Sequence, residues 1–122
     1  MALIEMVLAA GPDRPAGDVT DRIALRADLT AFGYLDIAGW FARKADWTFT
    51  RARPAGKVSG ELVREGAGGA GESWAVRGPD GADGPLWPFE TRVLRPGEYA
   101  TLRRPQGGTL VYRVVSVVPE PW

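Results

Sequence analysis

Apolar and charged residues alternate along much of this chain, and the alternation indicates β-strands. In residues 21–30, Ile23, Leu25, Ala27 and Leu29 alternate with Arg22, Arg26 and Asp28. Period-two alternation predicts a strand with one buried face and one wet face, with Asp28 on the wet side. The apolar run 3–8 predicts an earlier strand, and the turn-forming residues between the two predict a loop.

One segment has the features of a helix. Asp36 can cap its first turn by accepting a backbone N–H, and Leu35 and Trp40 occupy the two positions of a hydrophobic staple. Gly39 lowers the helix propensity by about 1 kcal/mol relative to alanine. We predict a short helix over residues 37–45.

Further strands are predicted on both sides of the middle of the chain. In residues 47–53, Trp47, Phe49 and Arg51 face one way, and Thr48 and Thr50 face the other. Residues 58–64 and 73–77 predict two more short strands. The C-terminal third predicts three strands joined by two turns, of which "RPGE" suits a type II turn with Pro96 at its second position and Gly97 at its third.

The second of these turns, "PQGG", offers Gly107 and Gly108 for positive φ angles. A loop with an even number of residues would pair Ala100 with Arg113 and mix apolar and charged residues on each face. A loop with an odd number places the apolar residues on one side: Ala100, Leu102, Leu110, Tyr112 and Val114. Since a slip of one residue exchanges the two faces of a strand, we predict the odd loop.

Together these segments predict a mainly β protein: a small antiparallel β-sandwich or β-barrel with one short helix, in a single domain over residues 1–122. Strands and helices do not alternate along the chain, which argues against a parallel α/β sheet. The choice between sandwich and barrel stays open.

Composition narrows the chemistry. The chain has 122 residues, 15 basic and 15 acidic, with no cysteine and no histidine. Balanced charge argues against nucleic acid as a partner. The absence of histidine removes the commonest general base and metal ligand, and the absence of cysteine excludes disulfides and thiolate chemistry. The N-terminal apolar run lacks a basic leader, is interrupted by Glu5 and is too short to span a bilayer, so we expect a cytoplasmic protein with no membrane contact.

Three motifs resemble functional sites without their required context. Gly66, Gly68 and Gly71 spell G-x-G-x-x-G, but a strand-like segment follows where a dinucleotide site needs a helix, so we predict a hairpin loop. Asp80 and Asp83 in "GPDGADGP" are too few for a calcium loop and predict a polar turn. No catalytic triad can form from the serines without histidine, and the strand carboxylates Glu61, Glu90 and Glu98 are expected to be solvated.

Tryptophan is enriched, with five residues. Trp40, Trp47 and Trp74 fit core positions. Trp87 and Trp122 have proline neighbours, which predicts exposure and a surface for interaction. Arg92, Arg95, Arg103, Arg104 and Arg113 gather near the C-terminal hairpin with Tyr99, and we expect a solvated face balanced by Glu90 and Glu98.

These observations favour a non-catalytic binding or assembly module that needs no cofactor or metal. It would act on a protein partner, or on a second copy as a homodimer, through a free strand edge and a surface of Trp87, Trp122, Tyr99, Arg103 and Arg104. Two alternatives stay open. One is a barrel or sandwich that binds a small molecule or carbohydrate. The other is a carboxylate-dependent hydrolase with two acids in one cleft.

Overall fold

The computed structural model describes residues 1–120 apart from 13, 66–72, 78–84 and 106, and it leaves out 121–122. Its strands are β1 (Ala2–Ala10), β2 (Asp18–Ala27), β3 (Thr48–Arg53), β4 (Gly56–Glu65), β5 (Ser73–Arg77), β6 (Trp87–Thr91), β7 (Tyr99–Arg103) and β8 (Thr109–Pro119). A helix α1 (Ile37–Arg43) and a 3₁₀ turn η1 (Lys44–Asp46) lie between β2 and β3. The predicted strands and the predicted helix are therefore present, with the end of the helix tightened into η1.

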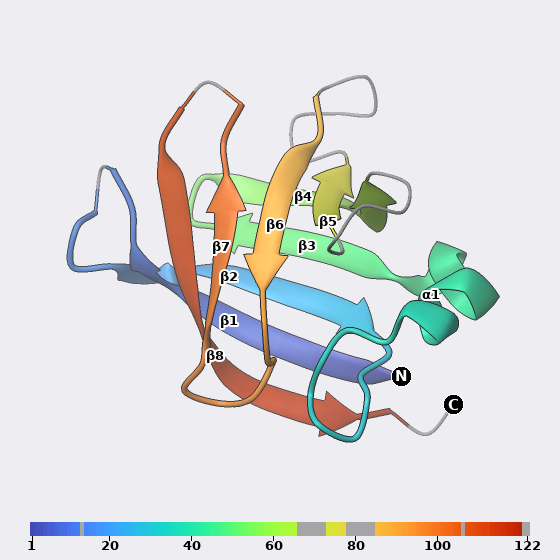
Figure 1. Cartoon of the computed structure of the whole chain (residues 1–122). Coiled ribbons are helices and arrows are strands. Elements are labelled where there is room, and N and C mark those ends of the chain that lie inside the picture. Colours follow the sequence, from blue (N-terminus) through green and yellow to red (C-terminus); the bar gives the residue numbers. More distant parts are fainter. Residues whose placement is uncertain (13, 66–72, 78–84, 106, 121–122) are drawn as a thin grey trace.

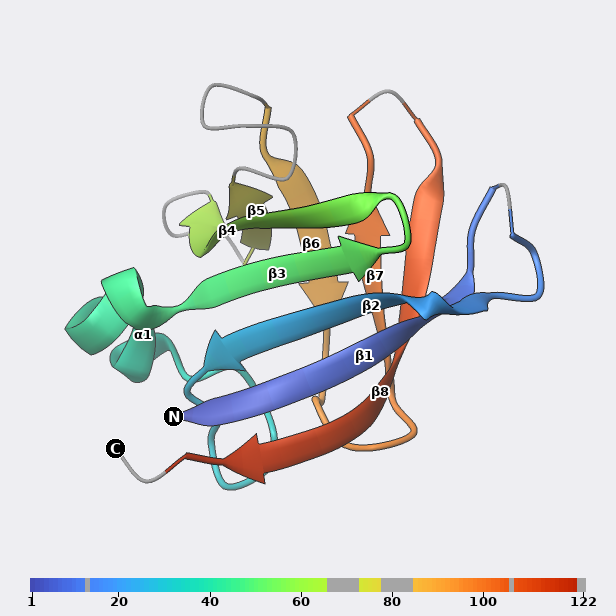
Figure 2. The same ribbon diagram turned by 180° about the vertical axis from the view of Figure 1, so that it is seen from behind.

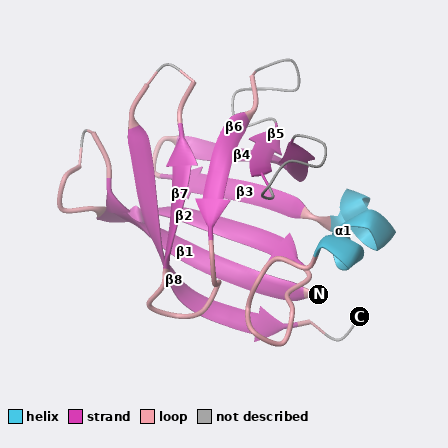
Figure 3. Ribbon diagram, viewed as in Figure 1, coloured by secondary structure: helices cyan, strands magenta, loops and turns pink. Residues whose placement is uncertain are grey.

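The eight strands form a closed antiparallel barrel in which each strand pairs with its neighbours in sequence (Figures 1 and 3). Closure comes from β1, which pairs with β2 on one side and with β8 on the other. This settles the choice between sandwich and barrel. It also gives every described strand a partner on both sides, so the wholly free strand edge expected from the sequence is absent from the described residues.

Period-two alternation places the core. Leu102 pairs with Leu110 and Ala100 pairs with Tyr112, which leaves the five residues 104–108 as the loop between β7 and β8. The odd loop is therefore confirmed, and all five residues predicted to share a face are buried. The type II turn is confirmed as well, since Glu98 donates its N–H to the carbonyl of Arg95 at 3.0 Å and Gly97 has a φ of 93°.

Helix α1 and the termini lie at one end of the barrel, and the β1–β2, β3–β4 and β7–β8 connections lie at the other (Figures 1 and 2). At the helix end, the carboxylate of Asp36 accepts the backbone N–H groups of Ala38 and Gly39, which confirms the predicted cap. Leu35 and Leu94 are buried there, and Ile37 and Trp40 pack against the core. Apolar side chains therefore fill most of this end of the barrel.

Asp28 corrects the sequence analysis, because it is buried and not on a wet face. β2 ends one residue earlier, and the Asp28 carboxylate accepts hydrogen bonds from the Trp47 indole at 3.2 Å and from Arg43 of α1. A Cβ atom on Gly39 would lie 2.7 Å from the Asp28 Cβ, so α1 can approach this carboxylate only because residue 39 is glycine. The glycine that weakens the helix in isolation thus permits its docking.

Three tryptophans pack together beside α1, as their core positions predict. The rings of Trp47 and Trp74 stack with centroids 5.4 Å apart, and Trp40 meets Trp74 edge-on at 6.2 Å. Trp47 and Trp74 are buried and Trp40 is half-buried, with its indole N–H donated to the carbonyl of Leu62.

Neither α1 nor η1, the helices of the described chain, has the length and apolar character needed to cross a membrane.

A candidate ligand site at the barrel mouth

A cavity of about 610 Å³ opens at the end of the barrel opposite α1, and we call it the mouth cavity. Its walls come from the ends of β1, β2, β3, β6 and β8 and from the loops between them. The residues that line it are Leu8, Gly11, Pro12, Arg14, Asp18, Asp21, Arg51, Arg53, Pro54, Ala55, Trp87, Arg104 and Leu110. Four arginines and two aspartates thus surround a cavity in a chain with no net charge.

The charged residues reach the mouth cavity through the same alternation that builds the core. On β2 the inward positions 23, 25 and 27 are apolar, and the same series continued towards the mouth arrives at Asp21. On β3 it runs from Phe49 to Arg51 and Arg53, and the series of Ala100 and Leu102 on β7 continues to Arg104, which follows the strand. The interior of the barrel therefore changes from apolar to charged along its length.

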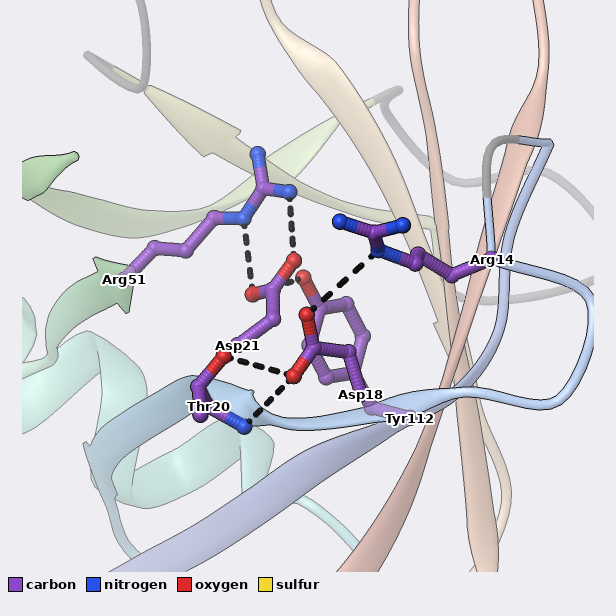
Figure 4. A network of polar contacts seen from close by, with 6 residues as sticks. All are labelled: Arg14, Asp18, Thr20, Asp21, Arg51 and Tyr112. Carbon is purple, nitrogen blue, oxygen red and sulfur yellow. Dashed lines mark hydrogen bonds and ion pairs between the residues drawn. The ribbon is translucent and has the colours of Figure 1, made fainter. Parts of the chain in front are cut away.

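Asp21 and Arg51 line the mouth cavity, and together with Tyr112 they form a polar network that we call its floor (Figure 4). Asp21 accepts two hydrogen bonds from the Arg51 guanidinium, from Nε at 3.1 Å and from Nη2 at 2.8 Å, and a third from the Tyr112 hydroxyl at 2.9 Å. The side chains of Arg51 and Asp21 are only 9% and 8% exposed. This two-point geometry fixes both side chains and satisfies buried charges that would otherwise be costly.

The floor is held in one protonation state by its own contacts. Burial raises the pKa of the Tyr112 hydroxyl well above its ordinary value, so this group stays a neutral donor. Burial is the largest single influence on the pKa of Arg51 and would lower it, but the hydrogen bonds to Asp21, the charge of Asp21 and the contribution of Tyr112 together raise that pKa. Arg51 therefore remains charged and its charge is neutralised by Asp21.

A second polar group, at the rim, comes from an irregularity in β2. Val7 pairs with Arg22 but the next residue, Leu8, pairs with Asp18, so the residues between them bulge out of register. The Asp18 carboxylate stabilises the bulge by accepting the Thr20 N–H at 2.9 Å and the Thr20 hydroxyl at 2.6 Å, and these bonds lower its pKa. Arg14 lies 3.6 Å from the same carboxylate (Figure 4).

Arg53 and Arg104 differ from the other two arginines of the cavity. Among the described residues neither forms an ion pair or a side-chain hydrogen bond, whereas Arg51 and Arg14 each face an aspartate. β3 and β7 are separated by three strands in either direction around the barrel. The two side chains therefore approach the mouth cavity from opposite walls.

The four described residues of the predicted interaction surface, Trp87, Tyr99, Arg103 and Arg104, do not share one face of the barrel. Trp87 is only 4% exposed and faces inward beneath the mouth cavity, so its predicted exposure was wrong. Trp122 lies outside the described residues. Tyr99 is 57% exposed, and Arg103 lies on the outer face, where its Nε donates to Glu90 at 2.7 Å as expected for a solvated face. Arg104, the next residue, points to the opposite side and lines the mouth cavity.

The remaining motifs fall into two groups. Gly66, Gly68, Gly71, Asp80 and Asp83 lie outside the described residues, although the element after the glycines is strand β5 and not a helix, as predicted. The carboxylates Glu61, Glu90 and Glu98 are exposed. Glu61 lies 3.9 Å from Arg77 and Glu90 bonds to Arg103, so they are the solvated strand charges that we expected.

A smaller hollow of about 350 Å³ lies beside α1, lined by Trp40, Lys44, Ala45, Glu61, Leu62, Val63, Arg64 and Arg77. Two of its cationic side chains already make cation–π contacts: Lys44 lies over the Trp40 ring and Arg64 over the Phe41 ring, each within 5.4 Å of the ring centroid. The mouth cavity is larger and has a built polar floor, so it is the better candidate.

Sequence reasoning named Arg104, but as part of an outer surface for a protein partner, and it did not single out Asp21, Arg53 or the bond from Tyr112. The signal was present in part, because Arg51 was placed on the same face as Phe49 and Trp47 and was therefore directed inward.

No family model, no curated protein and no solved structure matches this chain.

Proposed function

We propose that this protein is a non-catalytic binding barrel that holds a small ligand in its mouth cavity. The observation that carries the proposal is an open cavity of about 610 Å³ above a buried polar floor whose side chains are hydrogen-bonded to one another. This volume lies within the range of roughly 300–1,000 Å³ that small-molecule sites occupy. Of the alternatives drawn from the sequence, small-molecule binding is the one that this geometry favours.

The polar floor supports a role beyond stability. Replacing a buried ion pair by apolar residues of similar volume is often neutral or stabilising, so an interior needs no such pair in order to fold. The end of the barrel beside α1 is filled mainly by apolar side chains such as Leu35 and Leu94, and its buried carboxylate, Asp28, is paired with Arg43. The charged groups at the mouth differ because they line an open cavity, where rigidly held charges can orient a ligand.

The hydrolase alternative finds less support in the same cavity. Asp18 and Asp21 are its two carboxylates, and both already accept hydrogen bonds from neighbouring donors. The pKa of Asp18 is lowered by its bonds from Thr20, whereas a general acid needs a raised one. We therefore propose binding without catalysis.

Contact with a protein partner, including self-association, is a second candidate function. Strand addition loses its basis in a closed barrel, but large apolar side chains remain on the surface: Tyr99, Phe32 and Phe41 are 57%, 74% and 63% exposed. Exposed aromatic residues are common anchors in interfaces. Light scattering over a range of concentrations tests this candidate, with and without the last few residues; a strictly monomeric protein would speak against self-association.

Binding in the mouth cavity is tested by an NMR screen of a fragment library that holds neutral and charged compounds. Hits should shift the amide resonances of Arg53, Arg104 and Leu110. An Ala55→Trp variant places an indole at an exposed position of the cavity rim, and it should weaken each hit at least about tenfold by filling the space. Ala42→Trp is the matched control, because Ala42 is exposed on α1 at the far end.

Equal effects of the two tryptophan variants would contradict a site in the mouth. A library with no hit at those resonances would contradict the proposal as a whole. Circular dichroism of both variants confirms that each retains its fold before binding is compared.

A further inference from the structure

We propose that the mouth cavity recognises the doubly negative phosphate group of a small phosphomonoester, held between Arg53 and Arg104. This inference rests on the proposed function and specifies its ligand. Three observations support it: the net positive charge of the cavity lining, the placement of these two arginines on opposite walls, and the apolar residues beside them.

The charge balance of the cavity is the first step. Among the described lining residues, four arginines and two aspartates leave a formal charge of +2. Asp21 is fully engaged by Arg51 and Tyr112, and Asp18 by Thr20 with Arg14 nearby. Because the two carboxylates already face cations or donors, they repel an incoming anion only weakly, and the excess charge belongs to Arg53 and Arg104.

Geometry is the second step. Arg53 ends β3 and Arg104 follows β7 directly, and these two strands stand on opposite sides of the barrel. A guanidinium is a planar fork of N–H donors that matches two oxygens of a phosphate. A tetrahedral phosphate placed between the two side chains offers different oxygens to each fork, whereas a planar carboxylate offers only two oxygens and a single charge.

The apolar lining gives the third step. Leu8, Pro12, Leu110 and Trp87 also border the cavity. Inorganic phosphate alone would leave these side chains uncovered, so an organic body attached to the phosphate gains contact with them. The ligand class is therefore a phosphorylated small molecule with an apolar portion.

Isothermal titration calorimetry with phenyl phosphate and inorganic phosphate tests the proposal. Arg53→Gln and Arg104→Gln should each weaken the binding of phenyl phosphate by about tenfold or more, since each removes charge-assisted hydrogen bonds. Arg103→Gln is the matched control: it removes the same charge one residue away, on the outer face, and should change the affinity less than about twofold. Phenyl phosphate should bind more tightly than inorganic phosphate.

The pH dependence gives a second readout that does not rely on variants. Arg14, Asp18, Asp21, Arg51, Arg53 and Arg104 are the charged groups of the described cavity, and the chain contains no histidine. A phosphomonoester has its second pKa near about 6. Between pH 8 and pH 5, binding of phenyl phosphate should therefore weaken as the ligand takes up a proton, whereas binding of sulfate, which stays doubly negative, should not change.

Each outcome decides the matter. Neutral fragments that bind in the mouth and are displaced by Ala55→Trp, with no binding of phosphate, would overturn this inference and leave the proposed function standing. An equal loss of affinity for phenyl phosphate in Arg103→Gln and Arg104→Gln would indicate only diffuse attraction to surface charge, and it would also overturn this inference. Sedimentation with vesicles that contain phosphatidic acid separates the sources: retention that depends on Arg104, without binding of phenyl phosphate, would replace the small molecule by a lipid headgroup.

Discussion

The buried network of Asp21, Arg51 and Tyr112 makes a sharp prediction about stability. Asp21→Asn keeps the shape of the side chain but removes the charge that neutralises Arg51. In the unmodified protein the Arg51 guanidinium donates two hydrogen bonds to Asp21, at 2.8 and 3.1 Å. After the substitution it stays buried and keeps at most one of them, to the neutral amide oxygen. Breaking a buried ion pair by removing one partner destabilises a protein by about 3–5 kcal/mol.

We expect the lower end of this range, about 3 kcal/mol, because the network forms the floor of an open cavity where water can reach part of the guanidinium. That is a large share of the total stability of roughly 6–18 kcal/mol for a chain of this length. The midpoint of thermal unfolding should fall by roughly 10 °C. Urea denaturation followed by tryptophan fluorescence, with linear extrapolation to zero urea, measures the free energy of unfolding.

A triple variant provides the contrast. Asp21→Leu, Arg51→Met and Tyr112→Phe together remove every charge and donor of the network at similar volume, so no buried group is left unpaired. Its free energy of unfolding should equal or exceed that of the unmodified protein, and it should lose any ligand that the mouth cavity binds. A loss below about 1 kcal/mol in Asp21→Asn would refute the reasoning, because the pair would then behave as a solvated surface pair. A triple variant less stable than Asp21→Asn would refute it equally.

Three further predictions address the core, the helix and pH. Gly39→Ala should lower the free energy of unfolding by about 1 kcal/mol or more in urea, although alanine favours an isolated helix, because its Cβ would lie 2.7 Å from the Asp28 Cβ; a gain in stability would contradict the close docking of α1. Leu102→Ala should cost about 2–5 kcal/mol in the same assay, since Leu102 is fully buried, whereas Arg103→Gln on the exposed outer face should leave the stability almost unchanged. The raised pKa of Tyr112 stabilises the fold below the ordinary tyrosine pKa of about 10, and this stability should fall above that pH by up to about 1.4 kcal/mol per unit; denaturation between pH 9 and 11 should show a slope in the unmodified protein that is smaller in Tyr112→Phe, and equal slopes would contradict the assignment.

Local patterns were enough to predict the strands and one register. The pairing of Leu102 with Leu110 follows from the parity of a five-residue loop, because only an odd loop puts the apolar residues of both strands on one face. Barrel closure could not be predicted in the same way. It depends on the pairing of β1 with β8, which are more than a hundred residues apart at their ends, and no local pattern reports such a contact.

Trp87 shows which of two sequence signals prevails when they conflict. Its neighbour Pro88 suggested an exposed position. In β6, however, Trp87 and Phe89 face inward and Pro88 lies between them, paired with Ala75 of β5. Pro88 lies next to the start of β6, before the ladder with β7 begins at Phe89, and strands accommodate proline near their first residue. The period-two pattern then decides which side chain is buried. The buried aromatic residue was therefore predictable from alternation alone.

The residues of the candidate site follow from the same period-two alternation, applied to charged residues. Arg103 and Arg104 look like one basic cluster in the sequence, yet adjacent residues around a strand end face opposite sides, so one joins Glu90 outside and the other lines the mouth cavity. Arg53 is set apart from them in sequence but belongs with Arg104, because both continue inward series of apolar residues. The alternation of side chains does not predict that β3 and β7 stand opposite each other, because that arrangement depends on closure of the barrel. In a barrel protein, charges that extend an inward apolar series are therefore the ones to test first for ligand binding.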